Sequence, residues 1–189
     1  WSLEVGEIAT TLTNPAESGS AKVQYFTYGS GKDERRKEYR DVKYETKTVN
    51  MSSFVAQPKG LNKWYREWFW GFDLYNAPLN GRVWMPEKDE GGAYPLVLIV
   101  HGNHNMVDFS DGGYAYLGEM LASKGYIVAS VEQNFINSGK TGHIGWDNAG
   151  RAWLLLKHLE LWQSWNKDKT HALYNRVDME NIALIGHSR

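Results

Sequence analysis

The sequence contains no cysteine, and this absence excludes a disulfide framework, a thiolate metal site and a cysteine nucleophile. Long hydrophobic runs are also missing, since Leu96–Val100 is far shorter than the ~20 apolar residues of a membrane-spanning helix. Charge is balanced: 21 Lys and Arg stand against 22 Asp and Glu, for a net charge of −1. A near-neutral chain argues against nucleic acid as the main partner and against strong steering of charged ligands.

The first 80 residues have a polar, strand-prone pattern. Ala21–Tyr28 and Asp41–Asn50 alternate apolar or β-branched residues with charged ones, as half-buried antiparallel strands do. Between them, the mixed charges of Lys32–Arg40 favour a solvated loop. Leu61–Tyr75 is dense in aromatic residues, which indicates either an exposed platform for a lipid, polymer or sugar, or an amphipathic helix packed on the main domain; we favour the helix. We therefore expect residues 1–80 to form a strand-rich extension, with an aromatic-rich insertion, packed on the same domain.

The second half alternates buried strands with helices. Leu96–Val100, Tyr126–Val131 and Asn181–Ile185 are short apolar runs of the kind found in strands buried on both faces. Tyr114–Lys124 and Asn148–Trp165 have apolar residues at helical spacing. In the second of these helices the apolar face is predicted to consist of Ala149, Ala152, Trp153, Leu156 and Leu159. This order predicts the α/β class, with a mostly parallel, doubly wound sheet and antiparallel strands at its N-terminal edge.

The last apolar run leads directly into Gly186, His187, Ser188 and Arg189. A Gly-x-Ser at the end of a buried strand is the start of a nucleophile elbow, a strained turn that lifts the serine hydroxyl above the sheet edge. Ser188 is therefore the candidate nucleophile. The preceding strand makes the motif more specific, because Gly-x-Ser alone is common.

A second polar loop, His101-Gly102-Asn103-His104, follows the first buried strand. Carboxyl ends of parallel strands meet at one sheet edge, where open α/β sheets bind ligands. Acyl transfer places negative charge on a carbonyl oxygen, which backbone N–H groups must stabilise. We expect these donors to be the N–H groups of Asn103 and Arg189, with His104 as the fallback for Asn103.

The stretch from Gly81 to Arg189 resembles the first half of a serine α/β-hydrolase. The segments RVWMPE, YPLVLIVHGNH, LASKGYIVASV and NIALIGHSR are similar to the branch that holds chlorophyllases, platelet-activating-factor acetylhydrolases and cutinase-like polyester hydrolases. The resemblance implies an α/β-hydrolase fold and cleavage of carboxylic esters by Ser188 without metal or organic cofactor. It also implies an apolar or amphipathic ester as partner, small or polymeric, and slightly favours an exported protein. Residues 81–189 would then be the N-terminal half of the hydrolase domain.

In this superfamily the triad acid and the histidine follow the nucleophile in the chain. We therefore expect both beyond residue 189, with the sheet truncated after the elbow strand, and we expect these 189 residues alone to be inactive. Glu132 and His143, together with His104, are possible pocket-lining residues, although Glu132 also fits a solvated strand end.

The other histidines fit structural roles better than a catalytic one. We expect His101 to order the oxyanion loop, His187 to pack under the elbow, and His158 and His171 to lie at the surface. A metal site made of His104, Asp108 and Asp111 is conceivable, but Asp111 is better explained as the cap of the following helix. Two alternatives to an esterase stay open: a non-catalytic binding module of the same fold, or an amidase or peptidase, since the elbow does not distinguish leaving groups.

Overall fold

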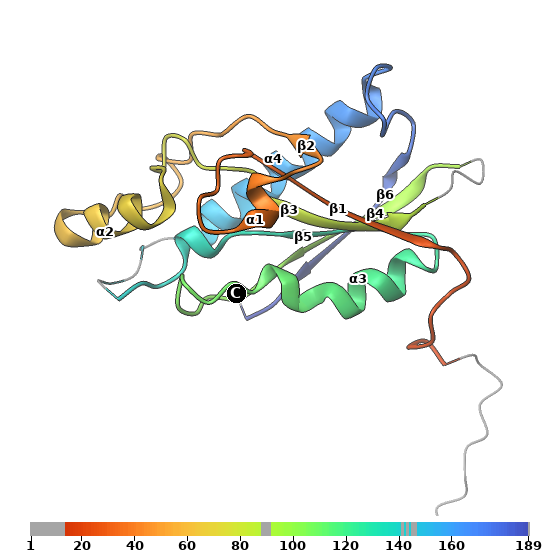
Figure 1. The fold of residues 1–189 in the computed structure, drawn as a ribbon, viewed down its shortest axis with the longest axis horizontal. Helices are drawn as coiled ribbons and strands as arrows, with labels where there is room; N and C mark the ends of the chain where they lie inside the picture. The colour runs from red at the N-terminus through yellow and green to blue at the C-terminus, as the bar shows by residue number, and fades with distance from the viewer. Residues whose placement is uncertain (1–13, 88–91, 141, 143, 145–146, 189) are drawn as a thin grey trace, which may run out of the picture.

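The protein, described here by a computed structural model, has one six-stranded sheet in the order β2-β1-β3-β5-β4-β6 (Figure 1). The structure describes residues 14–87, 92–140, 142, 144 and 147–188. The strands are β1 (Val23–Gly29), β2 (Tyr44–Glu45), β3 (Gly81–Pro86), β4 (Tyr94–Val100), β5 (Ile127–Val131) and β6 (Val177–Gly186). The helices are α1 (Lys37–Arg40), α2 (Gly60–Trp70), α3 (Ala115–Ala122) and α4 (Asp147–Lys167), with short 3₁₀ turns η1 (Asp111–Tyr114) and η2 (Asn134–Ile136).

The sheet is mixed. Strand β4 pairs in parallel with β5 and β6, while β3 pairs antiparallel with β1 and β5. The predicted α/β class is thereby confirmed, with a sheet that is parallel from β5 through β4 to β6 and antiparallel on both sides of β3. The prediction that Asp41–Asn50 is an antiparallel strand is wrong, because only Tyr44–Glu45 is a strand and it pairs in parallel with the end of β1.

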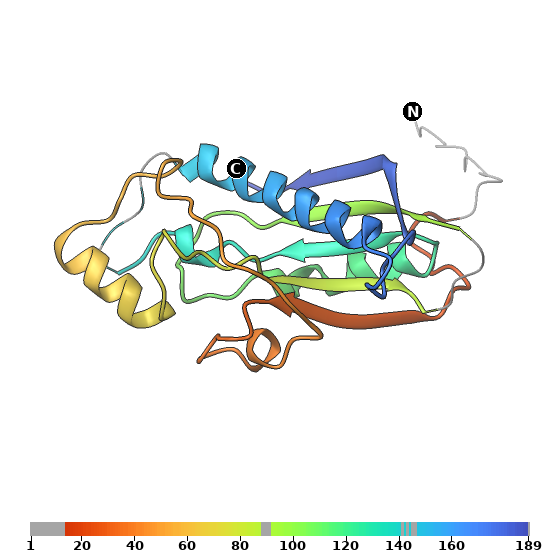
Figure 2. The same cartoon turned by 90° about the horizontal axis from the view of Figure 1, so that it is seen from above.

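Helices cover both faces of the sheet, α3 on one side and α4 on the other (Figures 1 and 2). On the α3 face, Leu117 and Leu121 pack against Val97, Ile99 and Val128. On the α4 face the main core forms from both helix and strands, with the buried members Phe26, Tyr28, Val83, Met85, Leu96, Leu98, Ile127, Ala129, Val131, Trp162, Trp165, Leu173 and Val177.

The buried face of α4 differs from the predicted one. The helix buries a stripe that contains Arg151, Leu154, His158, Trp162 and Trp165. Within the apolar set chosen from the sequence, Leu156 is instead 55% exposed. The expectation was wrong because two polar residues, Arg151 and His158, occupy buried positions that a search for apolar side chains passes over.

Strand β6 is an edge strand, with neighbours on one side only in the part of the chain that the structure describes. Its residues Ile182 and Leu184 are accordingly 38% and 55% exposed. The prediction that Asn181–Ile185 is buried on both faces is therefore wrong; a strand is present at this position, but it runs from Val177 to Gly186 and extends beyond the predicted segment at both ends.

Candidate active site

The turn after β6 brings Ser188 beside the loop that follows β4. Ser188 has a φ of +66°, a left-handed conformation that is uncommon for a residue with a side chain. The preceding residue, His187, donates its backbone N–H to the Val100 carbonyl at 3.2 Å. This hydrogen bond joins the ends of the neighbouring parallel strands β4 and β6 one residue before the strained Ser188.

Gly102 makes this close approach possible. A Cβ atom at position 102 would lie 2.7 Å from the Ser188 Cβ and 3.1 Å from the His187 carbonyl oxygen. The first distance is shorter than two packed carbon atoms tolerate, and the second would require the carbonyl oxygen to shift slightly. The glycine of the His-Gly pair therefore serves the contact between the two loops.

His101 holds the start of the loop from within the core. Its Nε2 accepts the backbone N–H of Gln133 at 3.0 Å, and its Nδ1 lies 2.9 Å from the Gly102 carbonyl. Burial lowers the pKa of His101 to about 4, so the ring is neutral at physiological pH. Because Nε2 is the acceptor, Nδ1 carries the ring proton and donates a hydrogen bond to the Gly102 carbonyl oxygen. The expected loop-ordering role of His101 matches these contacts.

Asn103 connects the loop after β4 to the loop after η2. Its Nδ2 donates to Ser138 Oγ at 3.2 Å and its Oδ1 accepts the Ser138 backbone N–H at 3.0 Å. Among the described residues, no acceptor takes the backbone N–H of Asn103. His104 is half-buried and its Nε2 lies 2.6 Å from Ser110 Oγ.

Two of the predicted site residues, Arg189 and His143, lie outside the described residues. Within the described chain, the Ser188 hydroxyl makes no hydrogen bond to a histidine or a carboxylate. His187 is exposed, so the expectation that it packs under the elbow is wrong. The candidate nucleophile Ser188 and the loop after β4 are therefore brought together, whereas a base for Ser188 is not among the described contacts.

Glu132 belongs to a buried ionic cluster. Its side chain has no exposed surface, and its Oε1 lies 3.3 Å from the Arg36 guanidinium, which also pairs with Asp33 at 2.6 Å. The Asn134 backbone N–H donates to the same oxygen at 2.6 Å. Burial raises the pKa of Glu132 while the Arg36 charge lowers it. The solvated strand end is thus wrong, and Glu132 faces Arg36 rather than an open cavity.

This cluster also overturns the prediction of a solvated loop at Lys32–Arg40. Asp33, Arg36 and Tyr39 are all buried, and Lys37–Arg40 forms α1. Tyr39 donates its hydroxyl to Asp111 Oδ2 at 2.6 Å. Burial, followed by the nearby Asp111 charge, raises the pKa of Tyr39 well above its usual value. The segment Lys32–Arg40 therefore contributes a buried ion pair, Asp33–Arg36, and the buried side chain of Tyr39 to the interior.

Asp111 is a buried carboxylate and not a helix cap. Its Oδ2 accepts hydrogen bonds from Arg82 Nε, at 2.5 Å, and from the Tyr39 hydroxyl. The residue at the N-cap position, Ser110, makes no side-chain capping hydrogen bond. Within the described residues, no three His, Cys, Asp or Glu side chains gather as a metal ion would require. Asp111 instead binds Arg82 and Tyr39, while His104 bonds to Ser110.

His158 is buried, so its predicted surface position is wrong. Its Nδ1 lies 2.6 Å from the Tyr28 hydroxyl, and it is 1% exposed on the inner face of α4. Burial lowers the pKa of His158 to about 3. In the neutral ring one nitrogen is unprotonated, and with the proton on Nε2 the Nδ1 atom accepts a hydrogen bond from the Tyr28 hydroxyl. His171, also expected at the surface, is half-buried and stacks on Trp165.

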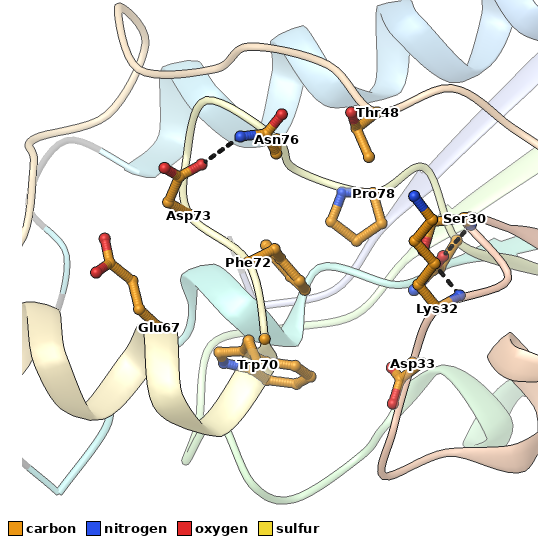
Figure 3. A pocket seen from close by; sticks show the side chains of 12 residues that line it. Ser30, Lys32, Asp33, Thr48, Glu67, Trp70, Phe72, Asp73, Asn76 and Pro78 are labelled. Carbon is orange, nitrogen blue, oxygen red and sulfur yellow. Dashed lines mark hydrogen bonds between the residues drawn. The ribbon is translucent and has the colours of Figure 1, made fainter.

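A cavity of about 550 Å³ opens between the segment that follows β1 and the end of α2 (Figure 3). Trp70 and Phe72 form its aromatic part, and Lys32, Glu67 and Asp73 contribute charged groups. Ser188, His104 and Glu132 do not line it. The cavity is therefore separate from the contact between the two loops, and sequence reasoning did not predict it.

Compared with models of known protein families and with curated proteins, the chain gives no match. Among the described helices, none has the length and apolar character needed to cross a membrane. The assignment of chemistry to the site therefore depends on its residues and their geometry.

Proposed function

We propose that this chain carries the nucleophile and the oxyanion loop of a serine hydrolase that cleaves carboxylic esters. The observation that carries the proposal is the positive φ of Ser188 at the end of a parallel strand, in contact with Gly102. A non-glycine residue in this conformation is strained by about 1–3 kcal/mol, and such strain is typical of functional sites. In a nucleophile elbow it exposes the hydroxyl to substrate.

The proposed reaction is a two-step acyl transfer. Ser188 Oγ attacks the ester carbonyl carbon as a histidine takes its proton, and the oxyanion is held by the Asn103 and Arg189 N–H groups. Collapse of this intermediate releases the alcohol, which receives the proton from the histidine. Water then attacks the acyl-serine, with the same histidine as base, and frees the acid and Ser188.

We assign the histidine and its acid partner to residues outside the described chain. His101 and His158 are neutral and buried, with hydrogen bonds to Gln133 and Tyr28. His104 forms a hydrogen bond with Ser110. None of these three therefore supplies a base to Ser188 in this arrangement. The preference for apolar or amphipathic esters follows from the near-neutral charge and the many aromatic residues of the chain.

A fluorophosphonate probe tests this proposal, because it reacts covalently with activated serine hydroxyls. We expect the full-length protein to be labelled and Ser188→Ala to abolish the labelling. Ser164→Ala, an exposed serine on α4, is the matched control and should be labelled like the wild type. Unchanged labelling of Ser188→Ala would place the nucleophile elsewhere, and a folded full-length protein without labelling would favour the non-catalytic binding module.

Turnover of p-nitrophenyl esters and anilides separates the remaining alternatives. We expect esters to be cleaved by the full-length protein in a Ser188-dependent manner, and anilides to be cleaved more slowly. The reverse preference would favour the amidase or peptidase. The 189 residues alone should be inactive, and Ser188-dependent turnover by them would contradict the assignment of the base to other residues.

A further inference from the structure

Helix α2 presents an apolar stripe to solvent. Leu61, Trp64 and Trp68 follow the spacing of one helix face and are 77%, 62% and 59% exposed. The two indole rings stack, with centroids 6.1 Å apart and planes inclined by 8°. We call these three side chains the α2 stripe. The sequence-based expectation that the aromatic side chains of this segment pack on the main domain is wrong for both tryptophans.

The opposite face of α2 fixes the stripe in this outward orientation. Arg66, 4% exposed, donates to the backbone carbonyls of Phe135, Asn137 and Gly142 at 3.0, 2.7 and 3.0 Å. Rolling the helix to bury the tryptophans would break these charge-assisted hydrogen bonds. The exposure of the stripe is therefore a property of the folded protein. Figures 1 and 2 show α2 at one end of the molecule, beyond the sheet.

Positive charges flank the stripe. Lys59 precedes the helix, Lys63 lies one turn from Lys59, and the Arg35 guanidinium lies 5.0 Å from the centre of the Trp68 ring. The acidic residue on the helix is Glu67, whose carboxylate is 3.7 Å from Lys63. These groups leave an excess of positive charge around the stripe, although the whole chain has a net charge of −1.

The size and chemistry of the stripe favour a lipid surface over a second protein. At most about 250 Å² per tryptophan gives roughly 300 Å² for Trp64 and Trp68, and Leu61 adds less than a tryptophan would, so the stripe stays below the area of about 800 Å² that each partner of a standard protein interface buries. Tryptophan and leucine with flanking lysines and arginine are the residues that place a helix in the headgroup region of a bilayer. Basic groups at that depth attract anionic lipids.

We propose that the α2 stripe docks this protein on the surface of a bilayer that contains anionic phospholipids. Leu61, Trp64 and Trp68 enter the headgroup region, and Lys59, Lys63 and Arg35 face the lipid phosphates. This docking does not depend on Ser188 being a nucleophile. Because Arg66 ties α2 to the segment that follows β5, the stripe lies at the carboxyl edge of the parallel strands, the edge that also carries Ser188.

Flotation with lipid vesicles tests the proposal. We expect the wild type to float with vesicles of phosphatidylcholine and phosphatidylglycerol, and to bind more weakly to phosphatidylcholine alone. The double variant Trp64→Ala/Trp68→Ala should bind to these vesicles at least about tenfold more weakly than the wild type. Tyr116→Ala, a 71% exposed aromatic residue on α3, is the matched control and should bind like the wild type.

The charges are tested separately, with Lys59→Glu/Lys63→Glu against Lys169→Glu, an exposed lysine after α4. We expect the first to weaken binding to the anionic vesicles and the second to leave it unchanged. Brominated lipids should quench wild-type tryptophan fluorescence, and this measurement holds even if a variant folds poorly. Equal binding to both vesicle types, wild-type binding by the tryptophan variant, or a dimer that depends on the stripe without vesicle binding would each overturn the proposal.

Discussion

Acid should destabilise this protein through its two buried neutral histidines, His101 and His158. Their pKa values are lowered from 6.5 to about 4 and about 3 by burial. The unfolded chain therefore binds protons at a higher pH than the folded one does. Their contribution to stability is fully present above pH 6.5 and is lost as the pH falls towards these folded-state values.

The magnitude follows from the same values. Between pH 7 and pH 5, each histidine removes about 2 kcal/mol of unfolding free energy, or about 4 kcal/mol for the pair. This is a large part of the 5–15 kcal/mol that stabilises a typical domain. Glu132 acts in the opposite direction, because a raised pKa means that protonation on acidification favours the folded state. A histidine variant is needed to separate these contributions.

His158→Gln isolates one of them. A glutamine oxygen can still accept the Tyr28 hydroxyl, which lies 2.6 Å from His158 Nδ1, but it does not titrate. The difference in unfolding free energy between wild type and His158→Gln should therefore shift by about 2 kcal/mol in favour of the variant from pH 7 to pH 5. Urea unfolding followed by tryptophan fluorescence at each pH gives this difference.

The matched control is Ala152→Gly, an exposed position on the same helix. This substitution should lower the unfolding free energy by about 1 kcal/mol, because glycine has a low helix propensity, and the loss should be the same at both pH values. If the gap between wild type and His158→Gln stays constant from pH 7 to pH 5 while both proteins unfold in two states, His158 is not held neutral by the fold and the reasoning is refuted.

Two further predictions concern the contacts at the sheet edge. Gly102→Ala should displace the Ser188 turn, because its Cβ would lie 2.7 Å from the Ser188 Cβ; we expect a loss of about 1–3 kcal/mol in chemical unfolding and slower fluorophosphonate labelling of the folded protein. Labelling at the wild-type rate would show that the two loops need not touch. Asp111→Asn should cost about 3–5 kcal/mol, since it removes the buried charge that pairs with Arg82 and accepts the Tyr39 hydroxyl. A cost below about 1 kcal/mol in urea unfolding would mean that Glu38, the other carboxylate on Arg82, compensates.

The sequence predicted the features that depend on local patterns. The apolar runs of β4 and β5, the helix α4 and the Gly-x-Ser turn after β6 all follow from hydrophobicity and turn residues at short range. The buried polar groups could not be predicted in this way. Arg36 is buried because Glu132, far away in the chain, lies 3.3 Å from it, and a run of mixed charges carries no information on such a partner.

The same limit explains the wrong face of α4. Burial of His158 requires Tyr28 on β1, and burial of Arg151 requires Asp147 and Asn137, whose contacts are 3.1 and 2.5 Å. A pattern of apolar residues alone favours the side with Leu156. One signal was present: Leu154, Trp162 and Trp165 share helical spacing with His158, which indicates a face where a histidine is buried among large apolar side chains.

These buried polar contacts converge on the segment from Glu132 to Ser138, which follows β5. Arg36 binds it from the N-terminal charge run, Arg66 from α2, and Arg151 from α4. His101 and Asn103, on the loop after β4, bind it through Gln133 and Ser138. The contacts of Arg36, Arg66, Arg151 and His101 are buried, so losing one of them would leave a buried polar group without that partner; together they restrain the segment against moving independently of its neighbours.

A loop that must offer backbone N–H groups to an oxyanion gains from this rigidity, because the donors then need no reorganisation during the reaction. The bonds to Ser138 engage the side chain of Asn103 and leave its backbone N–H without an acceptor among the described residues. Arg36 and Arg151, two of the polar residues whose burial the apolar pattern did not predict, thus bind the segment to which the candidate oxyanion loop is attached. Local patterns predict Ser188 at the sheet edge, and long-range polar pairs fix the side chain of Asn103, the described residue of the two proposed donors.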